Sequence, residues 1–393
     1  MTRRVLFLGA GSSVGAGYPL GRDLIRAVED YFATTELDVG RKAYWSRFLA
    51  RRDTANEMEK LLLMSGNPEV VLSYLDLCAE ALTADDAAIQ GVERAAINEF
   101  KNIRDGDIAT AFAAERGEYI ETLYDDLKRR PLDSAVRARL GFVAGLDAYL
   151  QHMHWRDDQA EEGHRREYLH RELASLGDGD VVITTNYDTL AERVLLETRR
   201  WSAADGYGFS VPLTNTPRDT LRPRRAPPDW VTTPSKVKVL KLHGSFGWRH
   251  IEGASESKPG EIILGSELLS GMLPRRKGRI SLLYDRREQS ASFPMTVPAL
   301  AYPSFLKQMS GSTFLEVWEA ARIALANADE IRVLGASLPA ADMAVRTLFG
   351  PTRFRLERGE VSVQLDDKSE ESFDRWSEHL GRKVRWERRF AGE

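Results

Sequence analysis

Three residues with side chains suited to chemistry each follow a short run of apolar residues. Asn186 and Asp188 come after Val181–Ile183, and His243 comes after the alternating segment Lys236–Leu242. A histidine at a strand end beside glycine is either a hydrogen-bonded structural residue or a base that faces a ligand, and His243 taken alone favours the structural role. Asn186 and Asp188 could simply cap the next helix. However, the run of five polar or aromatic residues from 184 to 188 is longer than a cap requires.

A glycine-rich segment near the N-terminus could bind phosphate. Gly9, Gly11, Gly15 and Gly17 follow the apolar run Val5–Leu8. Glycines can take positive φ and let a ligand approach the backbone, and the N–H groups at the start of the next helix carry partial positive charge. Each anionic contact contributes only about 0.3–1 kcal/mol at an exposed site, so several donors must converge. A tight strand-to-helix turn explains this segment equally well when it is taken alone.

The spacing of these glycines argues against two common nucleotide-binding classes. The P-loop pattern G-x-x-x-x-G-K-[ST] does not occur in the chain, and Val14 stands where the third glycine of G-x-G-x-x-G belongs. No strand that ends in an acidic residue follows about 20 residues later, as a dehydrogenase site requires. An ordinary NTPase or dehydrogenase is therefore disfavoured.

Strands and helices that alternate along the chain are expected to position these residues in an α/β fold. In open parallel sheets ligands bind at the carboxyl ends of the strands, which is where the candidate residues lie. Amphipathic helices are predicted through about Phe32, from Leu190, and over Phe314–Leu325. The predicted strands are Val5–Leu8, Val181–Ile183, Lys236–Leu242, Ile331–Leu334 and, as the last strand, Val361–Leu365.

The region between the first two strands is predicted to be helical. From about Thr54 to Ser175 the sequence shows helical periodicity and no convincing strand. We therefore expect a helical insertion over residues 41–175, between residues 1–40 and 176–393 of the α/β domain. Residues 202–235 are rich in Pro, Arg, Thr and Gly and are expected to form a long loop, a kind of segment that often serves as a lid. Apolar residues share a helix face in three stretches: Val71, Leu75, Cys78 and Leu82; Ile120, Leu123, Tyr124 and Leu127; Leu140, Val143, Leu146 and Leu150.

Composition excludes several classes of protein. The chain has 393 residues, of which 42% are hydrophobic, and a net charge of −4, which argues against a general nucleic-acid binder. The basic runs Arg222–Arg225 and Arg275–Arg279 are interpreted as solvated loop charge. Cys78 is the single cysteine, so an intramolecular disulfide and a cysteine-built zinc ribbon are excluded. The sequence shows neither a signal peptide nor a transmembrane stretch, so we expect a soluble cytoplasmic protein.

A group of histidines raises the question of a metal site. His152 and His154 are followed by His164 and His170 in a charged stretch. The segment carries no paired carboxylate pattern and is expected to be exposed, so solvated surface is the favoured interpretation. We assign no metal.

Four short motifs, taken together, resemble the sirtuin (SIR2) family. The family's first motif, G-A-G-x-S-x-x-S-G-I-P-D-F-R, aligns without a gap on residues 9–22, and its late G-T-S resembles Gly335-Ala-Ser337. The family motif T-Q-N-I-D is represented by Thr184, Asn186 and Asp188, and its catalytic H-G by His243 and Gly244. The residues that match in the first motif are Gly9, Ala10, Gly11, Ser13, Gly17, Pro19 and Arg22.

The resemblance implies a Rossmann-like parallel sheet that binds NAD and residues that cleave the bond between its ribose and nicotinamide. It implies that Asn186 orients the ribose hydroxyls and the attacking water, that Asp188 supports the loop, and that His243 is the general base. The residues implied in NAD binding are Gly9, Ala10, Gly11, Ser12, Ser13, Pro19, Arg22, Thr184, Gly335 and Ser337.

Departures from the sirtuin pattern point to one branch of the family. Gly21 replaces the phenylalanine that shields the reactive ribose carbon in deacylating sirtuins, and the zinc ribbon that helps to bind acyl-lysine peptides is missing. The chain therefore looks more like the SIR2-like NAD hydrolases of bacterial anti-phage defence. This implies hydrolysis of NAD⁺ to nicotinamide and ADP-ribose, with NAD⁺ as the substrate, no metal and no membrane.

An NAD hydrolase must be gated, because unregulated activity would kill its host. We expect a homo-oligomer and a separate partner such as a HerA-like ATPase or an Argonaute-like protein, with no direct binding of nucleic acid. Two alternatives stay open. A protein deacylase would release nicotinamide only when acyl-lysine peptide is present, and a non-catalytic NAD or ADP-ribose sensor would leave the ligand intact. The presence of both Asn186 and His243 weighs against the sensor.

Overall fold

The computed structural model of this chain describes most of the predicted α/β domain and part of the predicted insertion. Residues 68, 71–72, 74–75, 138, 141–143, 145–146, 148–150 and 152–153 are also described. The continuous described ranges are 2–35, 39–64, 167–203, 205–209, 234–251, 262–264, 296–300, 312–338 and 342–388.

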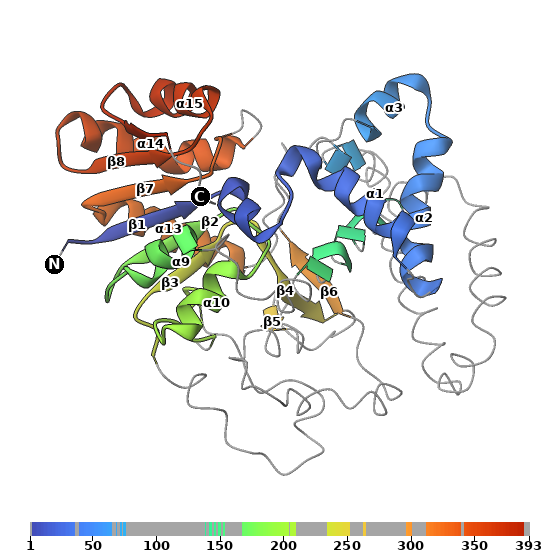
Figure 1. Cartoon of the computed structure of the whole chain (residues 1–393), viewed down its shortest axis with the longest axis horizontal. Coiled ribbons are helices and arrows are strands. Elements are labelled where there is room, and N and C mark those ends of the chain that lie inside the picture. Colours follow the sequence, from blue (N-terminus) through green and yellow to red (C-terminus); the bar gives the residue numbers. More distant parts are fainter. Residues whose placement is uncertain are drawn as a thin grey trace, which may run out of the picture.

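A parallel sheet of six strands forms the centre of the α/β domain, in the order β3-β2-β1-β7-β8-β9 (Figure 1). Phe7 in the central strand β1 pairs with Ile183 on one side and with Val333 on the other. Each pair of neighbouring strands runs parallel, so the loops that leave the strands' carboxyl ends meet at one edge of the sheet. The strands are β1 (Arg4–Leu8), β2 (Val181–Thr184), β3 (Lys238–Lys241), β7 (Glu330–Leu334), β8 (Ser362–Asp366) and β9 (Arg385–Glu387).

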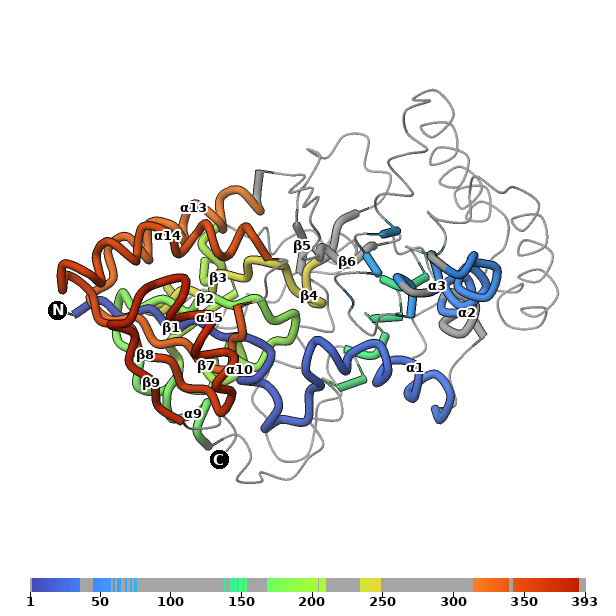
Figure 2. Tube along the Cα trace, turned by 90° about the horizontal axis from the view of Figure 1, so that it is seen from above, coloured from blue at the N-terminus to red at the C-terminus, as the bar shows by residue number. Residues whose placement is uncertain are grey.

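Helices cover both faces of this sheet. Figure 2 shows α13 and α14 along one side of the strands and α9 on the opposite side. The ring of Phe7 contacts Phe349 of α14 edge to face at 5.0 Å and Trp376 of α15 at 6.1 Å. The helices of this domain are α9 (Glu167–Ala174), α10 (Leu190–Glu197), α13 (Ser312–Asn327), α14 (Met343–Glu357) and α15 (Glu370–Leu380).

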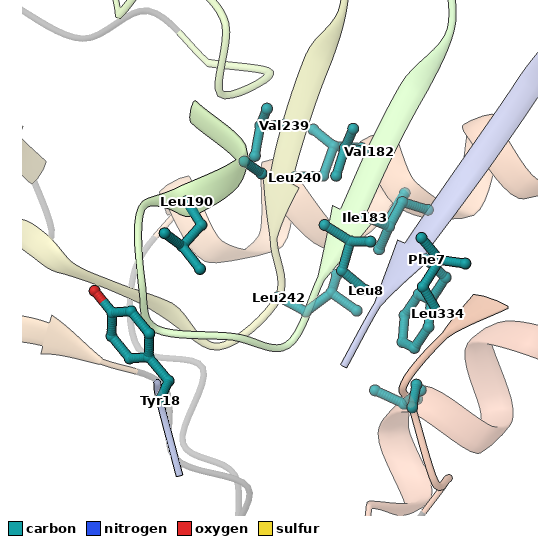
Figure 3. Close-up of a cluster of buried hydrophobic side chains, with 14 of the residues drawn as sticks. Phe7, Leu8, Tyr18, Val182, Ile183, Leu190, Val239, Leu240, Leu242 and Leu334 are labelled. Carbon is teal, nitrogen blue, oxygen red and sulfur yellow. The ribbon is translucent and has the colours of Figure 1, made fainter. Parts of the chain in front are cut away.

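Burial on both faces explains why the central strands are apolar without alternation. Val5 to Leu8 are each at most 3% exposed, and Val182 and Ile183 are fully buried. A strand that is covered on both faces has no solvent side that would favour polar residues. Figure 3 shows Phe7, Leu8, Ile183 and Leu334 grouped together within this core.

Each of the five predicted strands is present, although Lys236–Leu242 is shortened to Lys238–Lys241, and two further corrections apply. Val361–Leu365 is not the last strand, because α15 and β9 follow it and β9 pairs with β8. The short segment Arg-Trp-Glu has no apolar run that would have indicated a strand. His243 is followed by a second strand, since β4 (Gly244–Ile251) begins at the next residue. It pairs antiparallel with β5 (Ile262–Leu264) and β6 (Thr296–Leu300) in a separate sheet of three strands.

The described part of the predicted insertion is helical. Its helices α2 (Val39–Asp53) and α3 (Glu57–Leu63) lie at the right of Figure 1, away from the parallel sheet. The helix α1 (Leu24–Thr34), which follows the 3₁₀ helix η2 (Gly21–Asp23) and precedes the predicted insertion, lies on the same side. Trp45 of α2 stacks on Phe32 at 5.3 Å and packs against Phe48 at 5.0 Å. The periodic stretch 120–127, residues Cys78, Leu82 and Leu140, and most of the predicted loop 202–235 lie outside the described residues.

Helix α9 lies within residues 41–175 but is bound to the sheet. Arg332 of β7 donates to Asp366 at 2.5 Å and to the hydroxyl of Tyr168 at 3.1 Å, and it also bonds Glu172. Tyr168 in turn donates to Asp366, and its burial raises the pKa of its phenol. These contacts attach α9 to β7 and β8. The placement of the insertion boundary at residue 175 stays a prediction.

The described histidines of the charged stretch have protein partners. His152 packs against Tyr31 with ring centroids 4.7 Å apart, and His170 is 47% exposed with its Nε2 4.0 Å from Glu197. His154 and His164, like the two basic runs, lie outside the described residues. No cluster of three or more His, Cys, Asp or Glu suited to a metal ion occurs within the described ranges. In that part of the chain no helix combines the length and the apolar character that crossing a membrane needs.

His379 is expected to make stability depend on pH. Burial lowers the pKa of its imidazole, and the charges of Arg346 and Arg353 lower it further, whereas the Arg346 carbonyl and Glu378 oppose this shift. The folded state therefore favours the neutral ring, so this contribution is complete above the ordinary pKa of about 6.5 and is lost as the pH falls below it. Urea unfolding of His379→Gln between pH 7.5 and 5.5 should show a smaller loss of stability than the wild type. An equal loss in both proteins would contradict the assignment.

Candidate functional site

The carboxyl ends of four parallel strands bring the predicted site residues to one edge of the sheet. β1 leads into Gly9, β2 leads into residues 185–188, β3 leads to His243, and β7 leads into Gly335. Gly9 and Gly335 follow the neighbouring strands β1 and β7, and the segments with Asn186 and His243 follow the neighbouring strands β2 and β3. The parallel order therefore places all four predicted motifs beside one another.

The glycines after β1 allow two loops to pack against each other. Gly11 donates its N–H to the carbonyl of Gly335 at 2.9 Å, and Gly9 donates to Leu334 at 3.0 Å. A methyl group on Gly9 would lie 2.5 Å from the Cα of Ala336, and one on Gly11 would lie 2.8 Å from the Cα of Gly335. Glycine is thus required at these two positions because the backbone of the neighbouring loop approaches them closely.

This packing limits which amides could hold a phosphate. Besides Gly9 and Gly11, Ser12 uses its N–H within the loop, donating to the Gly9 carbonyl at 3.0 Å. Ala10 is the first residue of the 3₁₀ helix η1 (Ala10–Ala16), and the amides at the start of a helix have no intrahelical acceptor. An anion at this loop would therefore bind at the N-terminus of η1 around Ala10, with fewer amides than the sequence suggests.

Gly335 should be among the least replaceable glycines of the chain. Its φ is +58°, and a methyl group there would lie 2.4 Å from the nitrogen of Ser12. Gly359 also has a positive φ, +75°, but a methyl group there would meet nothing within 4 Å. We expect Gly359→Ala to cost about 1–2 kcal/mol from backbone strain alone. Gly335→Ala should cost about 1–3 kcal/mol more because of overpacking. Urea unfolding of both variants measures the difference, and equal losses would show that the loops can separate freely.

The side-chain amide of Asn186 joins β2 to the glycine loop. Its Nδ2 lies 3.0 Å from the Gly9 carbonyl, 3.2 Å from Ser12 Oγ and 3.0 Å from Ser13 Oγ. Its backbone N–H donates to Thr184 Oγ1 at 3.0 Å, and that hydroxyl donates to the Leu8 carbonyl at 3.1 Å. Asn186 is partly exposed, so it is held firmly while one side stays open.

Asp188 is buried and supports the same loop. One carboxylate oxygen accepts from Ser13 Oγ at 2.7 Å, and the other accepts from the N–H of Leu190 at the start of α10 at 3.0 Å. The backbone carbonyl of Asp188 accepts from Lys241. Asp188 therefore fixes loop positions, and both of its carboxylate oxygens have protein partners.

A buried ion pair lies beneath this loop. Lys241 and Glu192 are 1% and 0% exposed, with Nζ and Oε1 3.1 Å apart. Tyr207 donates to the same carboxylate oxygen at 3.2 Å. Burial raises the pKa of the Glu192 carboxyl, and the charge of Lys241 opposes this shift. The pair anchors β3 and α10 to the Asp188 carbonyl.

His243 is buried at the end of β3 and contacts a carboxylate. Its Nε2 lies 3.1 Å from Oδ2 of Asp342, and the two side chains are 4% and 3% exposed. Its ring is 6.2 Å from that of Tyr187, the residue after Asn186. Trp318 donates to the carbonyl of Leu242 at 3.1 Å, which fixes the backbone just before the histidine. His243 is thus positioned by three segments that are distant in sequence.

The loop after β7 is held from outside by three side chains. Trp376 donates to the Ala336 carbonyl at 2.6 Å, Arg375 to the Ser337 carbonyl at 2.8 Å, and Arg346 to Leu338 at 3.4 Å. This loop contains Gly335, whose amide donates to the Asp366 carbonyl at 3.2 Å. The side chain of Ser337 is exposed and available to a ligand.

The remaining predicted residues differ in how far they are buried. Thr184 is buried at the end of β2, Pro19 is partly buried, and the side chain of Arg22 is 80% exposed, with its Nε 3.6 Å from Asp23. Gly21 is exposed, and a methyl group there would meet nothing within 4 Å. The open position at Gly21 therefore has room for a larger side chain.

Sequence reasoning missed Asp342, Lys241 and Glu192. Asp342 stands at the N-cap of α14, where it accepts from the N–H of Val345 at 3.2 Å. An aspartate before an amphipathic run is a helix-start signal, so its capping role could have been predicted. Nothing in the sequence indicates its contact with His243. Lys241 and Glu192 interrupt apolar segments, and a charge at such a position signals a buried partner.

Comparison with known proteins finds a family match over part of the chain. Residues 180–288 match the family model described as a SIR2-like domain, a range that contains Asn186, Asp188 and His243. The chain therefore carries a SIR2-like domain with a Rossmann-like parallel sheet. No curated protein matches the chain.

Solved structures similar to this chain are Sir2 homologues and sirtuins. A Sir2 homolog–NAD complex is 13% identical, with 100% of this chain and 86% of that chain covered and a TM-score of 0.36. A structure concerned with the basis of sirtuin substrate affinity is 13% identical, with 98% and 88% covered and a TM-score of 0.34. A mutant Sir2 homologue in complex with ADP-ribose is 13% identical, with 100% and 88% covered and a TM-score of 0.33.

Proposed function

We propose that this protein is an NAD⁺ glycohydrolase that releases nicotinamide and ADP-ribose. The observation that carries the proposal is the meeting, at one sheet edge, of a constrained amide and a buried histidine. Asn186 is bonded into the glycine loop at 3.0 Å from Gly9, and His243 lies beside the neighbouring residue Tyr187. The SIR2-like domain match over residues 180–288 and the NAD complex of a similar Sir2 homolog support NAD⁺ as the substrate.

The reaction needs an acceptor for one proton. The bond between ribose C1′ and the nicotinamide nitrogen breaks, and its electron pair leaves with nicotinamide, which becomes neutral. A water oxygen bonds to C1′, and the proton that this water loses passes to His243 and then to solvent. An imidazole suits this role because histidine exchanges a proton near neutral pH.

The remaining residues bind and orient the substrate in this proposal. The N-terminus of η1 at Ala10 would face the pyrophosphate, and Ser337 and Gly335 would contact the adenosine side. Asn186 would hold a ribose hydroxyl and the attacking water. Asp188 would act indirectly, since its two oxygens already hold Ser13 and the start of α10.

Water rather than an acyl-lysine peptide is the acceptor that the surroundings favour. Gly21 leaves open space at the motif position where deacylating sirtuins have a phenylalanine. Water could therefore approach the ribose carbon from this side. We further propose that hydrolysis depletes cellular NAD⁺ in anti-phage defence. Oligomerisation or a partner such as a HerA-like ATPase or an Argonaute-like protein would control it.

The test is nicotinamide release from NAD⁺ by the purified protein, measured by chromatography without any peptide. Wild-type turnover that Asn186→Ala abolishes would support the hydrolase. Release that begins only after acetyl-lysine peptide is added would show a deacylase instead. Binding of NAD⁺ without release, even with a candidate partner or phage lysate present, would favour a sensor.

A further inference from the structure

We propose that Asp342 is the positioning residue for His243, fixing the imidazole's tautomer and orientation. The catalytic consequence of this inference rests on the proposed hydrolase activity. Its structural basis is independent: Nε2 of His243 and Oδ2 of Asp342 are 3.1 Å apart, and neither residue is more than 4% exposed.

The two oxygens of Asp342 have separate partners, which determines how the carboxylate is oriented. Oδ1 accepts from the N–H of Val345 at 3.2 Å, at the first turn of α14, while Oδ2 contacts the histidine. The helix therefore holds one oxygen and directs the other at His243. The partial positive charge at a helix N-terminus favours the negative charge of a carboxylate held there.

An ionised carboxylate accepts hydrogen bonds and cannot donate them, so it requires a proton on Nε2 of His243. In the neutral ring the other nitrogen, Nδ1, then takes the proton from water. Once the ring is protonated, the nearby carboxylate stabilises the imidazolium. Because both groups are buried, this interaction is stronger than it would be at the surface.

Titratable side chains on two neighbouring segments lie near the ring of His243. Asp342 faces the ring from α14, and the phenol-bearing ring of Tyr187 lies 6.2 Å away on the loop after β2. Lys241, two residues earlier on β3, is committed to Glu192 and the Asp188 carbonyl. Among the described residues, Asp342 is therefore a carboxylate that lies against this imidazole.

The experiment must separate this role from helix capping. Asp342→Asn retains the side-chain oxygen, and asparagine caps helices as well as aspartate does, but the oxygen that faces His243 becomes an amide. We expect kcat for nicotinamide release to fall about 10²-fold or more, within the range of a general base, with little change in the dissociation constant for NAD⁺. Ser369→Ala is the matched control, because Ser369 caps the neighbouring α15 at 3.2 Å from the Ser372 nitrogen. It should lower the unfolding midpoint without lowering kcat.

A double-mutant cycle tests whether Asp342 acts through the histidine. In a His243→Ala background, Asp342→Asn should cause no further loss of kcat. A similar loss in both backgrounds would overturn the proposal, as would wild-type kcat in Asp342→Asn.

An NMR measurement keeps the proposal testable if the wild type releases no nicotinamide, a result that would count against the hydrolase itself. The ¹⁵N shifts of the His243 ring, assigned with His243→Gln, should show a proton on Nε2 in the wild type. In Asp342→Asn they should show a changed tautomer. Identical shifts in both proteins would overturn the inference.

Discussion

His243→Ala is expected to reduce kcat for nicotinamide release by about 10²–10⁴-fold, the usual contribution of a positioned general base. The substitution removes the proton acceptor while it leaves the glycine loop, Asn186 and the Gly335 loop intact. Binding of NAD⁺, measured by calorimetry, should therefore change far less than kcat. Loss of turnover with retained binding is the pattern of a group that acts in the transition state.

The variant also leaves the buried carboxylate of Asp342 without its imidazole, so some loss of stability is expected. His243→Gln provides a second variant, because it keeps a polar side chain near Asp342 but has no basic nitrogen. His170→Ala is the matched control, since that histidine is 47% exposed and lies 4.0 Å from Glu197, away from the sheet edge. If both His243 variants turn over NAD⁺ at the wild-type rate, the base lies elsewhere.

Lys241→Met is expected to destabilise the fold by about 3–5 kcal/mol, the usual cost of removing one partner of a buried ion pair. Methionine fills a similar volume, so the main effect is a buried carboxylate at Glu192 without its cation. Glu192 already has one oxygen, Oε2, without a hydrogen-bond partner among the described residues. The loss should therefore be large, and urea unfolding measures it.

Neutralising both partners should restore much of this stability. In the double variant Lys241→Met with Glu192→Gln no unpaired charge stays buried, and Tyr207 keeps an oxygen to donate to. We expect it to be more stable than Lys241→Met alone. Losses that simply add would show that the two residues are not coupled. Both variants remove the Lys241 donor to the Asp188 carbonyl, so this loss cancels when the two are compared.

Local patterns were sufficient to predict the strands that carry the candidate site. Val5–Leu8 and Val181–Ile183 were recognised because strands buried on both faces are continuously apolar, and the structure extends them by one residue to Arg4–Leu8 and Val181–Thr184. The same logic fails for β9, whose Arg-Trp-Glu sequence has no such run, and for β4, which begins at Gly244 directly after His243. Pairing with a neighbouring strand, rather than hydrophobic pattern, defines these two.

The glycine loop shows how an expected role can change once the fold is known. Its composition predicts a backbone that something can approach closely. In the structure that neighbour is the loop at Gly335, which accepts from Gly11 at 2.9 Å. Whether a glycine faces ligand or protein depends on which strand lies next to it, here β7 beside β1.

The sequence by itself determined which residues stand at strand ends, because buried strands and helix starts are encoded over a few neighbouring residues. It was sufficient to place Asn186, Asp188 and His243 at one edge of a parallel sheet. Only the tertiary structure decided their partners: Gly9 and Ser13 for Asn186, and Asp342 for His243. The physical reason is that such contacts join segments far apart in the chain, and strand order and helix packing bring them within hydrogen-bonding distance.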